Sequence, residues 1–132
     1  MVEENKIDQS EDIDDLDLEL LITQGREAKL RREIEVIDYD NDVTLRKAIY
    51  VRPLTHDEKI ESDKEATRKN SKRDLELLYC TKAWLDKNGN PIEPSLIRQA
   101  PGGIITEVYE AIKEVSLIDD AMDKWFDKME KS

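Results

Sequence analysis

Residues 71–86 (SKRDLELLYCTKAWLD) constrain the fold most, because their apolar side chains have helical spacing but do not keep to one side. A helix that is apolar over most of its circumference has to be covered by several neighbouring elements. We therefore predict a central helix over residues 71–86. The prediction depends on two sets of residues spaced three or four apart, Leu75, Leu78, Tyr79, Lys82 and Leu85 in one and Leu77, Cys80, Thr81 and Trp84 in the other.

A period of two, typical of a half-buried strand, runs through residues 43–52. A shorter run rich in Ile and Val precedes it at residues 33–38, and the four residues between them, Tyr-Asp-Asn-Asp, have turn chemistry. We predict a β-hairpin over residues 33–52. A lone hairpin is barely stable, so its apolar face must lie on helices. In the second strand that face would carry Val43, Leu45, Ile49 and Val51.

Capping signals and periodicity predict further helices. Thr55 and Glu58 match a capping box, which would begin a very polar helix over residues 56–69. Another helix, over residues 103–117, would place Lys113 and several acids on a polar side. Its apolar face would carry Ile104, Ile105, Val108, Ile112 and Val115. Shorter helices are expected over residues 95–100 and 118–130. The fold class is therefore α+β and mainly α, with an N-terminal β-hairpin packed on a bundle of about four to five helices.

The acidity of the chain belongs mostly to its first residues. The 132 residues carry a net charge of -11, and residues 1–20 hold nine acids and one lysine. We predict an acidic disordered tail over residues 1–15 and a single α+β domain over residues 16–132. Binding to nucleic acid or to an anionic membrane is not expected, because both require positive charge. A basic protein partner would be compatible with this charge, and formation of a homo-oligomer is left open.

Residue types needed for catalysis or metal binding are scarce. The chain has one histidine, His56, and one cysteine, Cys80, so neither a Ser-His-Asp or Cys-His arrangement nor a His/Cys metal site is expected. Gly102 and Gly103 are not followed by Lys-Ser or Lys-Thr, as a phosphate-binding loop requires. We expect no enzyme activity, no cofactor and no metal. With no apolar h-region and no apolar run of membrane-spanning length, we expect a soluble cytoplasmic protein.

Two apolar stripes are candidates for binding another protein. The first lies in a short predicted helix over residues 16–24, which Gly25 would end. The second lies near the C-terminus, where Met and Trp could line either the core or an adaptable docking face. The residues that we predict to contact a partner are Leu16, Leu20, Leu21, Met122, Trp125, Phe126 and Met129.

The order of these parts resembles the tail assembly chaperones of long-tailed bacteriophages and related proviruses. The resemblance covers residues 16–117. It rests on a strand that runs through IYVRPLT (residues 49–55) into the capped helix, and on Pro101-Gly102-Gly103 before a late helix. The chain departs from the family pattern at Ser116-Leu117, where Ser-Gly would be expected.

The resemblance implies a non-catalytic chaperone of the host cell cytoplasm that binds the tape measure protein and delivers tail tube subunits. Two alternatives stay open. One is a structural neck, connector or minor tail component, which would remain in the finished particle at fixed stoichiometry. The other is a small acidic regulator or inhibitor of a basic protein, which would bind with strong salt dependence.

Overall fold

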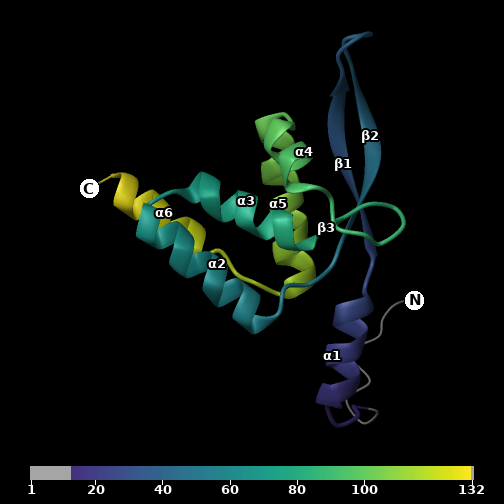
Figure 1. Ribbon diagram of the computed structural model, residues 1–132, viewed down its shortest axis with the longest axis vertical. Helices are drawn as coiled ribbons and strands as arrows, with labels where there is room; N and C mark the ends of the chain where they lie inside the picture. The colour runs from purple at the N-terminus through teal and green to yellow at the C-terminus, as the bar shows by residue number, and fades with distance from the viewer. Residues whose placement is uncertain (1–12, 132) are drawn as a thin grey trace.

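The computed structural model describes residues 13–131. These residues form one three-stranded antiparallel sheet and six helices (Figure 1). Residues 13–15 are exposed and lie outside any helix or strand, and the rest of the predicted acidic tail falls outside the described residues. The predicted α+β class is confirmed: the hairpin packs against helices, and most of the regular structure is helical. None of the helices in residues 13–131 is both long and apolar enough to cross a membrane.

The hairpin consists of β1 (Leu30–Asp38) and β2 (Val43–Val51), paired antiparallel along their full length. It begins three residues earlier than predicted. The Asp38 side chain stabilises the turn by accepting hydrogen bonds from the Asp40 backbone N–H at 3.1 Å and from Asn41 Nδ2 at 2.8 Å. Only one end of the hairpin is packed on helices, because Ile49 and Val51 are buried whereas Val43 is 47% exposed.

The central helix, α3 (Lys72–Ala83), buries Leu75, Tyr79, Cys80 and Ala83 completely. It is shorter than the helix predicted over residues 71–86. Trp84 has extended backbone angles, and Trp84–Leu85 form a two-residue strand, β3, that pairs with Val51 and Tyr50 of β2. This pairing and the burial of Leu85 explain why the chain leaves the helix at Ala83.

The remaining helices of the body are α2 (His56–Lys69), α4 (Pro94–Gln99), α5 (Gly102–Ser116) and α6 (Ala121–Glu130). The capping box predicted at Thr55 and Glu58 is present. The core lies between the hairpin and the helices, and Val108 and Ile112 of α5 lie within it, as their spacing predicts. α5 ends at Ser116, and the residue that caps it, Leu117, takes the left-handed conformation with φ 57° and is 93% exposed.

The first helix, α1 (Leu18–Glu27), projects away from this body at the start of β1 (Figure 1). Asp17 caps it by accepting a hydrogen bond from the Leu20 backbone N–H at 3.1 Å. The prediction that Gly25 ends this helix is wrong, because the helix continues to Glu27. A Cβ atom at Gly25 would lie 3.5 Å from Cγ of Pro53, an ordinary van der Waals contact, so this end of the helix lies beside the body. No residue of α1 is buried.

Candidate protein-docking surfaces

α1 carries an apolar stripe that no part of the described chain covers. Leu18, Leu21 and Ile22 follow the i, i+3, i+4 spacing that places side chains on one helix face. They are 58%, 51% and 47% exposed. We call these three residues the α1 stripe. Burying such side chains is favourable, so a helix that leaves them in water is a candidate for binding a partner.

The sequence prediction identified this region but not its geometry. Leu16 is exposed in the extended segment before α1, Leu20 points away from the α1 stripe, and Leu21 lies in it. Leu18 was missed, although its spacing to Leu21 and Ile22 is a signal that identifies it. All three predicted residues are more than half exposed, so the structure leaves each of them accessible to a partner.

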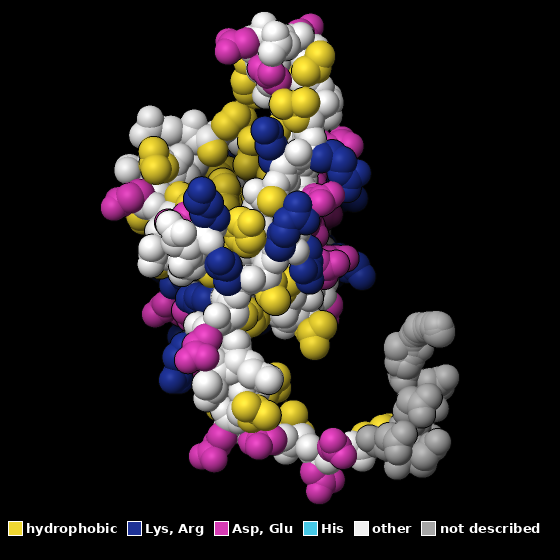
Figure 2. All heavy atoms as spheres, turned by 90° about the vertical axis from the view of Figure 1, so that its right-hand side faces the viewer, with side chains coloured by type: hydrophobic (Ala, Val, Ile, Leu, Met, Phe, Trp, Pro, Cys, Tyr) yellow, Lys and Arg dark blue, Asp and Glu magenta, His cyan; other side chains and the backbone are white. Residues whose placement is uncertain are grey.

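Acidic side chains surround the α1 stripe. Asp14, Asp15, Asp17 and Glu19 lie before it and at its start, and Arg26 is the one basic residue between positions 13 and 27. Figure 2 shows this end of the molecule as hydrophobic side chains flanked by acidic ones. An apolar face with an acidic rim favours a partner whose own apolar face is bordered by Lys or Arg.

The second predicted stripe is divided between core and surface. Phe126 is 6% exposed and belongs to the core, and Met122 packs against that core. The prediction that Phe126 contacts a partner is therefore corrected, because its side chain fills the space between α6 and the body. Trp125 and Met129 are 37% and 38% exposed. The Trp125 and Phe126 rings meet edge to face, with 4.9 Å between ring centroids. The large apolar side chains that α6 exposes are therefore Trp125 and Met129, and Trp125 packs on a buried neighbour.

A buried ion pair attaches α6 to α5. Lys113, expected on the polar side of its helix, is only 3% exposed and contacts both Asp120, at 2.6 Å, and Asp123. The Tyr109 hydroxyl donates a hydrogen bond of 2.7 Å to Asp123. Burial would raise the pKa of Asp123, but the hydrogen bonds from Lys113 and Tyr109 outweigh it, and that pKa is lowered. Burial would lower the pKa of Lys113, but its carboxylate partners raise it.

The same polar contacts continue into the centre of the body. The Tyr79 ring lies 5.1 Å from that of Tyr109, and the Tyr79 hydroxyl donates a 2.9 Å hydrogen bond to Asp63. Asp63 in turn forms a 2.6 Å ion pair with Lys59. Burial raises the pKa of both tyrosines, with these carboxylates adding to the effect, so both hydroxyls stay protonated. This network is structural, because it joins α2, α3, α5 and α6 beneath the surface.

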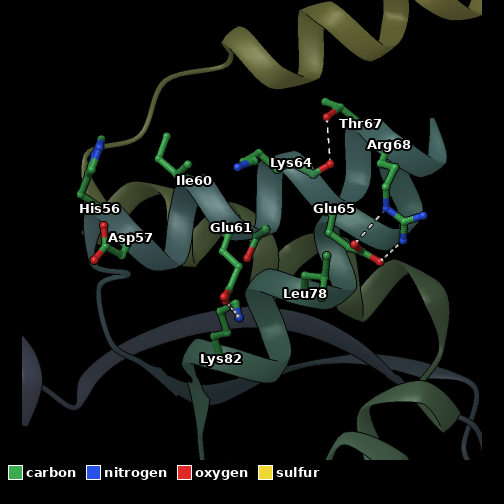
Figure 3. Close-up of a pocket in the computed structure, with 11 residues that line it drawn as sticks. His56, Asp57, Ile60, Glu61, Lys64, Glu65, Thr67, Arg68, Leu78 and Lys82 are labelled. Carbon is green, nitrogen blue, oxygen red and sulfur yellow. Dashed lines mark hydrogen bonds and ion pairs between the residues drawn. The ribbon is translucent and has the colours of Figure 1, made fainter.

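An open groove of about 1200 Å³ lies along α2 and α3 (Figure 3). Ile60 and Leu78 give it an apolar part, and charged side chains surround them. Several of these charges are already paired within the chain: Lys82 contacts Glu61 at 3.0 Å, and Arg68 contacts Glu65 at 2.8 Å (Figure 3). Sequence reasoning did not find this groove, because its walls come from two helices that only the fold brings together.

The residues that might have supported chemistry lie apart. His56 is exposed in the first turn of α2, whereas Cys80 is fully buried, and burial raises its pKa to about 12. Gly102 and Gly103 are the first residues of α5, and a Cβ atom at either would meet nothing within 4 Å. Within residues 13–131, no group of three or more His, Cys, Asp or Glu side chains is placed to hold a metal ion.

Because comparison with known proteins finds no match, any functional assignment has to be argued from the residues of this chain. The chain matches no protein-family model, no curated protein and no solved structure.

Proposed function

We propose that this chain is a non-catalytic tail assembly chaperone, which binds the tape measure protein and tail tube subunits of a long-tailed phage in the host cell cytoplasm. The single observation that carries the binding role is the α1 stripe: Leu18, Leu21 and Ile22 are each about half exposed on a helix with no buried residue. The phage assignment rests on the resemblance of residues 16–117 to that family.

The physical properties of the stripe suit a transient partner. Three aliphatic side chains offer a small apolar area, which supports reversible rather than permanent association. The acidic rim adds a preference for a partner with basic side chains beside its apolar face. A long helical protein that must be kept soluble until assembly offers many such faces. Trp125 and Met129 would supply a second, smaller contact on α6.

Co-purification from cells that express the chain with its neighbouring genes tests this proposal. We expect recovery of a long, helix-rich protein and a tube subunit, identified by mass spectrometry, and absence of the chain from finished particles. Leu18→Ser with Leu21→Ser should abolish recovery, whereas Leu96→Ser, which changes a leucine on α4 that is 61% exposed, should not. Presence at fixed stoichiometry in finished particles would instead support a structural component.

Trp125→Ala with Met129→Ala tests the second contact. If recovery of both partners were unchanged in this variant, α6 would have no role in docking. The α1 stripe would then be the remaining candidate surface.

A further inference from the structure

One long edge of the sheet is open. The strand order is β1-β2-β3, so among the described residues β1 pairs on one side only. It is nine residues long, contains no proline and shows no positive φ angle. A groove of about 570 Å³ runs beside it. The groove is lined by the five consecutive residues 33–37, by Tyr39 of the turn, by Thr44 and Arg46 of β2 and, on the far side, by Pro101, Gly103, Ile104 and Glu107. Because consecutive residues point to opposite faces of a strand, a groove lined by all five follows the edge itself.

The charges of β1 are segregated along its length. Arg31 and Arg32 lie at its start, and Glu33, Glu35 and Asp38 follow. Arg31, Glu33 and Glu35 share the solvent-facing side of the hairpin, whereas Arg32 lies on the other side and contacts Glu114 of α5 at 2.7 Å. Figure 2 shows basic side chains gathered over the hairpin with acidic ones beside them. A strand that is basic at one end and acidic at the other complements itself when a second copy runs antiparallel.

We propose that two copies of this chain pair through their β1 edges, antiparallel, with the two-fold axis at Glu33. This register places Arg31 of each copy opposite Glu35 of the other and joins the two sheets into one of six strands. The occupant of the edge is thus a second copy rather than an unrelated peptide. The proposal does not depend on the proposed function, because α1 takes no part in the pairing.

One neighbouring register is disfavoured by its charges. With the axis at Ile34, Glu33 would oppose Glu35 and Arg31 would oppose an isoleucine. With the axis at Arg32, Arg31 would oppose Glu33 and Lys29 would oppose Glu35, although the two Arg32 side chains would meet. The axis at Glu33 likewise brings two glutamates together, each already paired with Arg31 at 2.9 Å and with Arg46 at 3.2 Å in its own chain. Like charges facing each other across strands are destabilising, which disfavours the axis at Ile34. The double charge reversal below restores pairing only with the axis at Glu33, so it distinguishes that register from the axis at Arg32.

Light scattering after size exclusion, over a wide range of concentration, tests the pairing. The unaltered chain should have about twice the monomer mass of 15.4 kDa. Arg31→Glu and Glu35→Arg should each weaken the dimer about tenfold, because like charges would then face each other twice. The two changes together should restore it. Arg98→Glu, on α4, is the control and should leave the dimer unchanged.

A cysteine at the axis tests the register. Cys80, the chain's own cysteine, is fully buried, so Glu33→Cys would supply the one accessible thiol. In antiparallel strands, directly opposed residues lie within disulfide range, and mild oxidation should link two copies. Glu35→Cys is the matched control, since its two copies would lie several residues apart. The proposal is overturned by a monomeric unaltered chain, by a dimer that each single charge reversal leaves intact, by a double reversal that does not restore the dimer, or by equal linking of the two cysteine variants.

Discussion

The ammonium group of Lys113 contacts the carboxylate of Asp123, and this buried ion pair joins the last turn of α5 to the first turn of α6. Asp120, the residue directly before α6, contacts the same ammonium group at 2.6 Å. The position of α6, and with it the exposure of Trp125 and Met129, therefore depends on one lysine that points into the body.

Removing one partner of this ion pair should lower the free energy of unfolding. Asp123→Asn leaves the buried Lys113 with Asp120 and Glu110 as its remaining partners, so we expect the free energy of unfolding to fall by about 2–3 kcal/mol. Urea denaturation measures this change. Lys124→Met, an exposed lysine on the same helix, should change stability by less than about 0.5 kcal/mol. An equally small effect of Asp123→Asn would show that the pair does not hold α6.

The pH dependence of stability follows from the lowered pKa values of two carboxylates. The hydrogen bond from Arg52 lowers the pKa of Glu58, and Lys113 and Tyr109 lower that of Asp123. Since both groups bind protons more weakly in the folded state, their contribution is complete above the unfolded pKa values of about 4. It is lost as the pH falls through the lower folded-state values.

Denaturation in urea at a series of pH values checks this expectation. The free energy of unfolding should decline below pH about 4, and the decline should be shallower in Asp123→Asn, which has no carboxylate to protonate there. Identical slopes in the two proteins would contradict the assignment of Asp123.

Leu117 offers a stabilising substitution. It holds a left-handed conformation at the end of α5, and its side chain is 93% exposed, so it contributes almost no burial. Glycine adopts this conformation without steric cost, and Leu117→Gly should raise the free energy of unfolding by about 1 kcal/mol. Leu117→Ala is the control, because it removes the exposed side chain but keeps Cβ. Equal stability of the two variants would show that backbone strain at residue 117 is absent.

Arg52 should not tolerate lysine. Its guanidinium donates to both carboxylate oxygens of Glu58, at 2.9 and 2.8 Å, and to the backbone carbonyls of Lys82 and Pro53. These bonds join the end of β2 to α2 and to the end of α3, and lysine cannot reproduce their planar geometry. We expect Arg52→Lys to lower the midpoint of thermal unfolding, with a loss of about 1–3 kcal/mol.

The matched control for that change is Arg46→Lys, because the Arg46 side chain is 70% exposed and pairs with Glu33 at the surface. It should leave the thermal midpoint almost unchanged. A similar midpoint for both variants would mean that the four bonds of Arg52 add nothing beyond its charge.

Local patterns in the sequence predicted those parts of the fold that local physics decides. The alternation in residues 43–52 predicted the second strand, and the spacing of Val108 and Ile112 predicted the buried face of α5. The capping box at Thr55 and Glu58 was predicted because both of its hydrogen bonds lie within one turn. Such signals need no knowledge of what lies elsewhere in the chain.

The features that were missed depend on partners distant in the sequence. Lys113 was expected on the polar side of its helix, and it is buried because Asp123 provides a partner from another helix. Asp63, in the helix predicted to be very polar, is buried because Tyr79 provides a partner from α3. Trp84–Leu85 is a strand because β2 lies beside it. Phe126 was expected at a docking face, but its burial depends on how α6 is attached. In contrast, Leu16, Leu20 and Leu21 are exposed at the start of the domain, where the sequence predicted an apolar stripe on a short helix.

The separation of α1 from the core affects which substitutions this protein can accumulate during evolution. Substitutions in α1 do not create cavities, because none of its side chains is buried. Single substitutions on its surface can therefore accumulate as a partner changes, without lowering the free energy of unfolding of the body. Residues such as Leu75 and Val108, buried in the body, have no such freedom.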